Sequence, residues 1–328
     1  MPDNRTLRAR GCLLGLAIGD ALGGPTEGLL PETIRRRWGR LTDFLSESQT
    51  GSDDTEYALF NARLLLKHGA QISAEAFAGG WQKEIISASN TYKGAGFSEM
   101  LAIRNLQEGL LPPHSGHHLH AWSDGLAMRV APFGIVAAGR PELAARLAGM
   151  DGSVTHAGEG IFAGQAVAAA IACAMGGASV DAIVDAALGV IPPDSWTSTD
   201  IKRAVRLGAK SPDIWSALDP LYQEVVCTSY FWSDLAPEAV ALAFGILTAA
   251  RGGFRDAVLG GVNVGRDTDT IAAIAGAIAG AREGMGALPG EWTRRVLVSR
   301  GTCLSVVRGM NIQETADQLV ALAGRWDS

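Results

Sequence analysis

Apolar residues recur three and four positions apart along nearly the whole chain, which is the spacing of one face of an α-helix. This periodicity predicts helices over residues 7–22, 55–68, 74–87, 97–108, 125–138, 142–149, 157–175, 180–189, 199–208, 237–250, 268–281, 290–307 and 312–323. Alternating β-branched runs are scarce, and neither a βαβ rhythm nor a repeat of about 34 residues is visible. The pattern therefore predicts an all-α protein.

Small residues lie on more than one face of several of these helices, as in the segment 164–172 (GQAVAAAIA). Glycine accounts for 41 of the 328 residues. Small residues let helix backbones approach closely, and a helix that is apolar all round is a buried one. Loops are expected at 41–51, 110–123, 189–198 and 208–220, none of them long or polar enough to separate domains. We therefore expect a single large domain over residues 1–328, with core helices wrapped by others.

The charge and cysteine content exclude several classes of protein. The net charge is −6 with no basic block, which argues against a nucleic-acid partner. Four cysteines stand far apart, at Cys12, Cys173, Cys227 and Cys303, so neither a zinc finger nor a disulfide scaffold is expected, and a reducing cytoplasm fits. The apolar runs at 12–18 and 271–281 are too short for a membrane span, and Asp20 interrupts the first, which argues against a signal peptide.

Two clusters of acids and hydroxyls precede predicted apolar helices: Ser52-Asp-Asp-Thr-Glu56 and Asp267-Thr-Asp-Thr270. Either cluster alone is compatible with helix capping, and Asp53 with Glu56 fits a capping box. Capping does not account for several acids ahead of helices this apolar, since burying carboxylates together is costly without a cation. A hard divalent cation such as Mg²⁺ prefers these oxygen ligands. The two clusters form one site if the fold brings the two helix starts together.

Four motifs in order resemble the ADP-ribosylglycohydrolase family, which includes the dinitrogenase reductase-activating glycohydrolases. They are 11–27 (GCLLGLAIGDALGGPTE), 52–55 (SDDT), 127–132 (AMRVAP) and, after Thr155-His156, 265–276 (GRDTDTIAAIAG). The resemblance spans nearly the whole length. It implies an orthogonal all-α fold that binds two magnesium ions, or manganese in their place.

The resemblance also implies roles for individual residues. The implied metal ligands are Ser52, Asp53, Asp54, Asp267, Asp269 and Thr270. Glu27 matches an acid beside the family's site, and we expect it to act as base or gate, with Asp53, Asp54 and Asp269 as the further catalytic acids. Two positions depart from the family pattern: Ser52 replaces a threonine and keeps the oxygen, whereas Arg266 replaces a glycine. Arg266 is therefore expected to meet a substrate phosphate or carboxylate, or to neutralise the acids.

Weaker candidates come from the remaining motifs. Asp20 is expected to support the site or to cap a helix. The segment Ser123-Asp124-Gly125 resembles a loop that lines the substrate, and its alternative is a simple helix cap. His156 resembles a substrate-side histidine, and its alternative is a structural role. Four histidines between 114 and 120 lack the spacing of a zinc site.

The resemblance implies a magnesium-dependent hydrolase that cleaves the glycosidic bond between ADP-ribose and an acceptor, which is a protein side chain or a small molecule. Water would attack the ribose anomeric carbon. The alternatives are a hydrolase of a small N-glycoside such as a nucleoside, and a structural or binding relative without catalysis. The acceptor, the linkage and the oligomeric state stay open.

Overall fold

The computed structural model describes residues 3–87 and 94–326. Helices dominate this part of the chain, which contains isolated β-bridges and no strand pairing beyond them. The α-helices are α1 (Asn4–Gly23), α2 (Pro31–Trp38), α3 (Asp53–His68), α4 (Ala74–Gly80), α5 (Phe97–Gln107), α6 (Ala131–Val136), α7 (Pro141–Thr155), α8 (Glu159–Ala174), α9 (Val180–Leu188), α10 (Trp196–Lys210), α11 (Ile214–Val225), α12 (Ala236–Ala249), α13 (Phe254–Asn263), α14 (Thr268–Glu283), α15 (Gly290–Val296) and α16 (Ile312–Trp326). The all-α prediction is confirmed.

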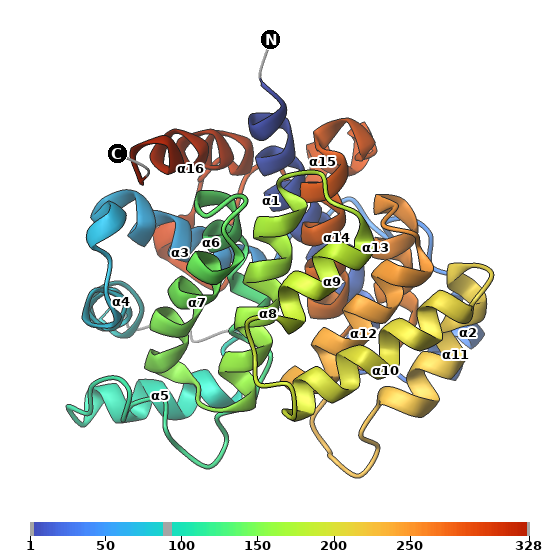
Figure 1. Cartoon of the computed structure of the whole chain (residues 1–328), viewed down its shortest axis with the longest axis horizontal. Coiled ribbons are helices and arrows are strands. Elements are labelled where there is room, and N and C mark those ends of the chain that lie inside the picture. Colours follow the sequence, from blue (N-terminus) through green and yellow to red (C-terminus); the bar gives the residue numbers. More distant parts are fainter. Residues whose placement is uncertain (1–2, 88–93, 327–328) are drawn as a thin grey trace.

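Shorter turns join some of the helices. They are the short 3-10 helices η1 (Gly24–Thr26), η2 (Gly69–Gln71), η4 (Ala127–Arg129), η5 (Met285–Ala287) and η6 (Ser305–Val307), and the π-helix η3 (Trp81–Ile86). The helices cross at many angles around a central pair, and the start of α1 lies at the same end of the molecule as α16 (Figure 1).

Three predictions from periodicity are wrong. The expected loop at 208–220 is largely helical, because α10 runs on to Lys210 and α11 starts at Ile214, where Asp213 and Ser216 form a capping box. The helix expected over 290–307 ends at Val296, and the chain then pairs Val298 with Asn311 in an antiparallel bridge. The helix expected over 125–138 is broken into η4 and α6. Periodicity also missed α2 and α13, which are short.

The helices α1 and α14 form the centre of the fold and make the most extensive helix–helix contact in the described chain. Both are buried over most of their length. Glycines at the contact leave no room for a side chain: a methyl group on Gly11 would overlap the carbonyl of Gly280, and one on Gly15 would overlap that of Gly276. The expectation that small residues bring helix backbones together is confirmed at this pair.

The same contact continues to the end of α1 and the start of α14. A methyl group on Gly23 would overlap the backbone of Asp269. Just beyond, Thr26 in η1 donates a hydrogen bond to the carbonyl of Val262 (2.8 Å) and lies 2.9 Å from the hydroxyl of Thr268. The antiparallel pair therefore fixes Asp20, in the last turn of α1, beside Asp269 at the start of α14.

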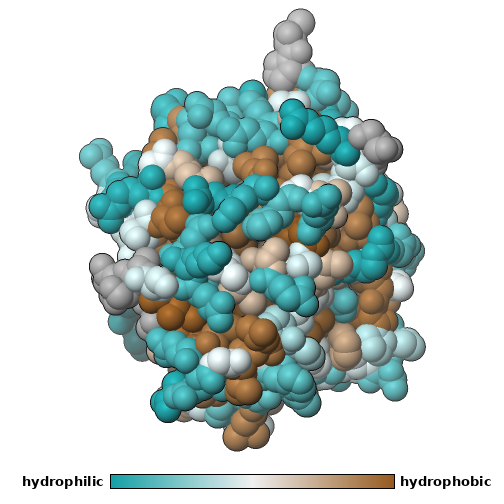
Figure 2. Space-filling view, turned by 90° about the vertical axis from the view of Figure 1, so that its left-hand side faces the viewer, coloured by the Kyte–Doolittle hydropathy of each residue, from teal (hydrophilic) through white to brown (hydrophobic). Residues whose placement is uncertain are grey.

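The surface is mixed in character. On the face shown in Figure 2, polar side chains are spread among scattered apolar ones, and apolar groups gather toward its lower part. Across residues 3–87 and 94–326, no helix combines the length and hydropathy that a membrane span requires. Within the described residues, none of the four cysteines forms a disulfide bond.

The α1–α14 contact predicts opposite effects for two glycine-to-alanine substitutions. Gly276→Ala places a methyl group against the carbonyl oxygen of Gly15 and should lower the free energy of unfolding by about 1–3 kcal/mol. Gly324→Ala, at an exposed position in α16 with open space around it, should raise it by about 0.5–1 kcal/mol through helix propensity. Denaturant unfolding of both variants checks this, and equal effects would contradict the packing argument.

A candidate acidic active site

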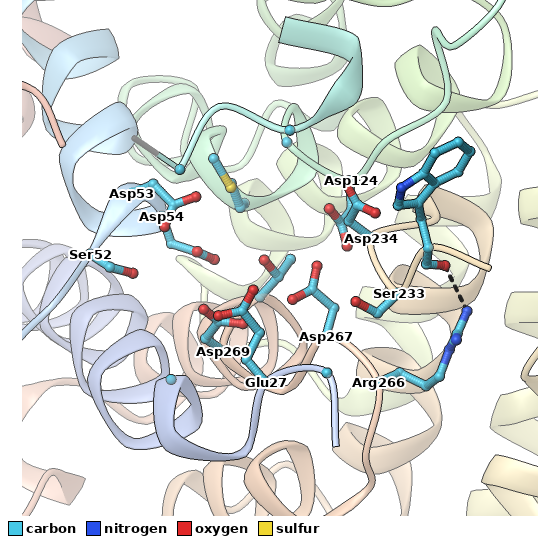
Figure 3. A pocket seen from close by; sticks show the side chains of 18 of the residues that line it. Glu27, Ser52, Asp53, Asp54, Asp124, Ser233, Asp234, Arg266, Asp267 and Asp269 are labelled. Atoms are coloured by element: carbon cyan, nitrogen blue, oxygen red, sulfur yellow. Dashed lines mark hydrogen bonds between the residues drawn. The ribbon is translucent and has the colours of Figure 1, made fainter. Parts of the chain in front are cut away.

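A cavity of about 820 Å³ opens where η1, α3 and α14 meet, which is within the usual size range of ligand sites. Its other walls come from the segments 94–96, 124–125 and 231–234. Seven carboxylates line it: Glu27, Asp53, Asp54, Asp124, Asp234, Asp267 and Asp269. Figure 3 shows Ser52, Asp53 and Asp54 on one side, Asp124 and Asp234 on the opposite side, and Glu27, Asp267 and Asp269 between them.

Asp20, from the last turn of α1, organises the start of α3. Its carboxylate accepts hydrogen bonds from the backbone N–H of Ser52 (2.7 Å) and of Thr55 (3.0 Å) and from both their hydroxyls (2.6 and 2.5 Å). A helix start leaves unpaired N–H groups that an anion stabilises. Asp20 therefore caps α3 from another helix, and this leaves the side chains of Asp53 and Asp54 directed at the cavity.

The capping box expected between Asp53 and Glu56 is absent. Glu56 is fully buried and accepts hydrogen bonds from the backbone N–H groups of Thr302, Cys303 and Leu304, at 2.8, 2.8 and 2.6 Å. One acid of the first cluster thus serves the fold by fixing the 302–304 loop. Asp53 and Asp54 remain for the cavity.

The second cluster lies at the start of α14, as predicted. Thr268 faces inward and donates to the carbonyl of Gly23 (3.0 Å), whereas Asp267, Asp269 and Thr270 line the cavity. The backbone before them turns sharply, with φ of 87° at Gly265 and 68° at Arg266. Both values lie in the left-handed region, which favours glycine. This turn separates the side chain of Arg266 from that of Asp267.

Two groups of acidic oxygens are close enough to share a cation. Ligand atoms of Asp20, Asp54 and Asp269 lie within 4.8 Å of one another, and so do those of Glu27, Asp267 and Asp269. The buried oxygens Asp54 Oδ1 and Asp269 Oδ1 have no hydrogen-bond partner, which is costly for a carboxylate unless a cation satisfies it. Asp20 is less available, because its hydrogen bonds to α3 already occupy both oxygens. The donor set fits a hard divalent cation.

The crowding of acids raises their pKa values. Burial, and then the charge of Asp20, raises the pKa of Asp53 to about 7. Burial also raises the pKa of Asp54 and of Asp269 well above the ordinary value. The second cause is a neighbouring negative charge, which is that of Asp20 for Asp54 and that of Asp267 for Asp269. Without a cation, the folded protein therefore disfavours ionisation of all the carboxyl groups that line the cavity.

Ser123 and His156 lie behind the cavity wall. The His156 ring is buried, with Nε2 at 3.0 Å from the hydroxyl of Ser123 and Nδ1 at 2.7 Å from that of Thr155. Burial, followed by the charge of Arg129, lowers the pKa of His156 well below its ordinary value, so the ring is neutral. Asp124 and Gly125 do line the cavity. The structure thus brings Asp124 and Gly125 to the cavity surface and leaves Ser123 and His156 beneath it.

A fully buried ion network supports this wall. Arg129 donates to Glu99 (2.8 Å), to Asp151 (2.8 Å) and to the carbonyl of Gly125 (3.1 Å). All three charged side chains are inaccessible to solvent. Sequence reasoning noted the motif that contains Arg129 without giving it a role, and Glu99 and Asp151 carry no local signal.

Arg266 does not face the acids. Its Nε bonds to Glu238 Oε1 at 2.5 Å, and its Nη2 donates to the carbonyl of Trp232 at 2.8 Å. Figure 3 shows the side chain extending away from Asp267 and Asp269. The expectation that Arg266 neutralises the cluster is therefore wrong, because its charge is paired with Glu238. Asp234, on the neighbouring wall, was missed, since an isolated acid in an irregular segment gives no sequence signal.

The four histidines between 114 and 120 lie outside both groups of potential metal ligands found among the described residues. Within residues 3–87 and 94–326, groups of three or more potential ligands occur solely at the two acidic positions described above. The ring of His120 packs against the rings of Phe97 and Trp232.

Fold and site together define an all-α protein with a buried acidic cavity suited to a cation. The sequence profile of the ADP-ribosylglycohydrolase family matches residues 1–328, and the chain belongs to this family. An uncharacterized protein of Archaeoglobus fulgidus is 34% identical over 86% of this chain and 89% of its own length. The ADP-ribosylarginine hydrolase Tri1 of Pseudomonas putida is 29% identical over 91% of this chain and 76% of its own.

A solved structure supports the fold. The protein described as "ADP-ribosylglycohydrolase-related protein complex" superposes with a TM-score of 0.67 at 24% identity, covering 98% of this chain and 99% of that one. The expected family resemblance and the expected all-α fold are therefore confirmed.

The raised pKa values predict how pH affects the metal-free protein. As pH rises above 3.8, the ordinary value, unfolded carboxyls ionise before their folded counterparts, so the free energy of unfolding falls. The contribution of Asp53 to this fall is complete once pH passes about 7, its folded pKa, and Asp54 and Asp269, with pKa values raised well above the ordinary one, add to the fall. Asp54→Asn removes one repelling charge and should raise stability in EDTA at pH 8 by about 1–3 kcal/mol, and hardly at pH 4.

In millimolar Mg²⁺ the wild type should be more stable than Asp54→Asn, because it keeps the ligand. A cation that binds the folded state stabilises it, by about 2.7 kcal/mol at a hundredfold excess over Kd. Thermal melts with and without metal measure both effects. Asp185→Asn, an exposed acid on α9, is the control and should change neither. A destabilised Asp54→Asn protein in EDTA at pH 8 would count against repulsion in the cavity.

Proposed function

We propose that this protein is a metal-dependent hydrolase that releases ADP-ribose from a modified acceptor, and that residues 1–328 act as one catalytic domain. The observation that carries the proposal is the meeting of two separate acidic motifs at Asp269, whose oxygens lie within 4.8 Å of both Asp54 and Asp267. A structural relative without catalysis has no reason to retain unpartnered, mutually repelling carboxylates in an open cavity.

The proposed ligands of the cation are Ser52, Asp53, Asp54, Asp267, Asp269 and Thr270. Sharing of Asp269 between two groups suits a pair of ions, and magnesium or manganese fits oxygen ligands of this kind. When bound, such ions supply Lewis-acid chemistry, because they orient hydroxyl oxygens and make water more acidic.

The protein's own side chains account for the remaining steps. Glu27 lies at the edge of the cavity beside Asp267 and Asp269, with its carboxyl turned toward the acids. Burial of its carboxyl, and then Asp20, raises its pKa, which suits a group that accepts a proton from the attacking water. Carboxylates on the cavity floor stabilise the positive charge that develops at the anomeric carbon of the ribose.

The acceptor that fits this cavity is cationic. After the proposed ligands are assigned, Asp124 and Asp234 remain on the opposite wall, and the buried oxygen Asp124 Oδ2 has no partner. Among the described lining residues, Arg266 is the sole Arg, Lys or His, and Glu238 pairs with it. Negative walls attract a guanidinium, and the Pseudomonas putida relative is named an ADP-ribosylarginine hydrolase. We therefore propose an arginine acceptor.

A hydrolase of free nucleosides is the second candidate. The contacts of Arg266 with Glu238 and with the carbonyl of Trp232 favour this candidate, because they leave its guanidinium paired within the protein and directed away from a substrate phosphate. Activity on a panel of free nucleosides, with no release of ADP-ribose from modified protein, would select this reading over the first.

Metal removal and one substitution test the proposed chemistry. Purified protein with Mg²⁺ should release free ADP-ribose from ADP-ribosylarginine, and EDTA should abolish release. Asp269→Ala should lower kcat/KM by about a thousandfold or more, because it removes a group shared by both acidic sites. Asp185→Ala, on the surface of α9, is the control. Release in EDTA, or full activity of Asp269→Ala, would overturn the mechanism.

The acceptor assignment makes a separate prediction for Asp234. Asp234→Asn should raise KM for ADP-ribosylarginine about tenfold, the cost of one charge-assisted contact. Binding of ADP-ribose itself, which lacks the acceptor, should stay within about twofold by calorimetry. Equal losses for both ligands would show that Asp234 does not face the acceptor.

A further inference from the structure

We propose that Arg266 is a positioning residue, which fixes the 226–235 segment as one wall of the cavity and thereby sets affinity for the substrate. This rests on the proposed function for its kinetic consequence, although not for its structural one.

The side chain of Arg266 connects to the 226–235 segment in several places. Its Nη2 donates to the carbonyls of Trp232 (2.8 Å) and Tyr230 (3.5 Å), and its Nε bonds to Glu238 (2.5 Å). Glu238, itself 1% exposed, accepts a further bond from the backbone N–H of Cys227 at 2.8 Å. The ion pair therefore fixes both the beginning and the middle of the segment.

The segment depends on such contacts, because it lies between α11 and α12 without helical structure of its own. The C-terminal end of this segment is bonded to the loop that carries Asp124: the N–H of Asp124 donates to the carbonyl of Asp234 at 3.0 Å. The Trp232 ring packs against Phe97 and His120, with ring centroids 5.5 Å apart in each case. Arg266 supplies the charged connection on the side nearest α14.

The backbone of Arg266 connects to a third part of the cavity. Its carbonyl accepts from the N–H of Gly28 (2.8 Å), and its own N–H donates to the carbonyl of Leu29 (3.2 Å). The next residue, Asp267, belongs to the acidic cluster. Arg266 thus links the segment after Glu27, the start of α14 and the wall that carries Asp234.

A glycine at this position would keep the backbone bonds and the left-handed φ of 68° while removing the side-chain contacts. Arg266→Gly is therefore an informative variant, since it also relieves the strain of a non-glycine residue there. The matched control is Arg251→Gly: Arg251 also has a positive φ, 55°, and its guanidinium donates to the carbonyl of Ser211 (3.1 Å) away from the cavity.

The experiment compares wild type, Arg266→Gly, Arg266→Lys and Arg251→Gly in Mg²⁺. Hydrogen–deuterium exchange of 226–235 should be about tenfold or more faster in Arg266→Gly, with α14 unchanged, and intermediate in Arg266→Lys. KM for the ADP-ribosylated substrate should rise about tenfold, and kcat should fall by a smaller factor. Arg251→Gly should change neither the exchange of this segment nor KM.

Exchange of 226–235 that is unchanged in Arg266→Gly would overturn the proposal, whatever the kinetics. Equal falls in kcat and kcat/KM with KM unchanged would also overturn it, because Arg266 would then act in the transition state and not on the wall. If wild type releases no ADP-ribose, the proposed function fails, and the exchange measurement alone still decides whether Arg266 positions the segment.

Discussion

The backbone contact between α1 and α14 is the interaction on which the rest of this structure depends. Glycines on both helices allow the two backbones to touch along their length. Because the helices run antiparallel, the end of α1 meets the start of α14, and Asp20 lies beside Asp269. Asp20 then caps α3 and fixes the direction of Asp53 and Asp54. One steric condition at the centre of the fold thus determines which acids share the cavity.

The acids reduce the stability that the core provides. Seven carboxylates line one cavity, and most are deeply buried, where like charges raise one another's pKa values. Supporting groups in the same region have partners of opposite character: Glu56 accepts from three backbone N–H groups, and Arg129 donates to Glu99 and Asp151. The contrast between paired supporting groups and unpartnered cavity oxygens is typical of a site built for a ligand.

Much of the site was predictable because its residues are adjacent in sequence. Asp53 and Asp54, and likewise Asp267 and Asp269, stand just before long apolar helices, where an excess of acids is visible without a structure. Glu56 belonged to the same pattern, and its true partners, the N–H groups of 302–304, are remote in the chain. The helix α11 escaped prediction because it contains Pro220, a residue that is more typical of a loop than of a helix interior.

The sequence by itself determined the helical fold class, the close helix packing and the two acidic helix starts, since each depends on spacing within one segment. The tertiary structure decided which groups those segments meet. It placed His156 beneath the wall, turned Arg266 toward Glu238 and added Asp234 to the cavity. The physical reason is that burial, ion pairing and cavity shape are set by residues distant in the chain, and no local pattern records those neighbours.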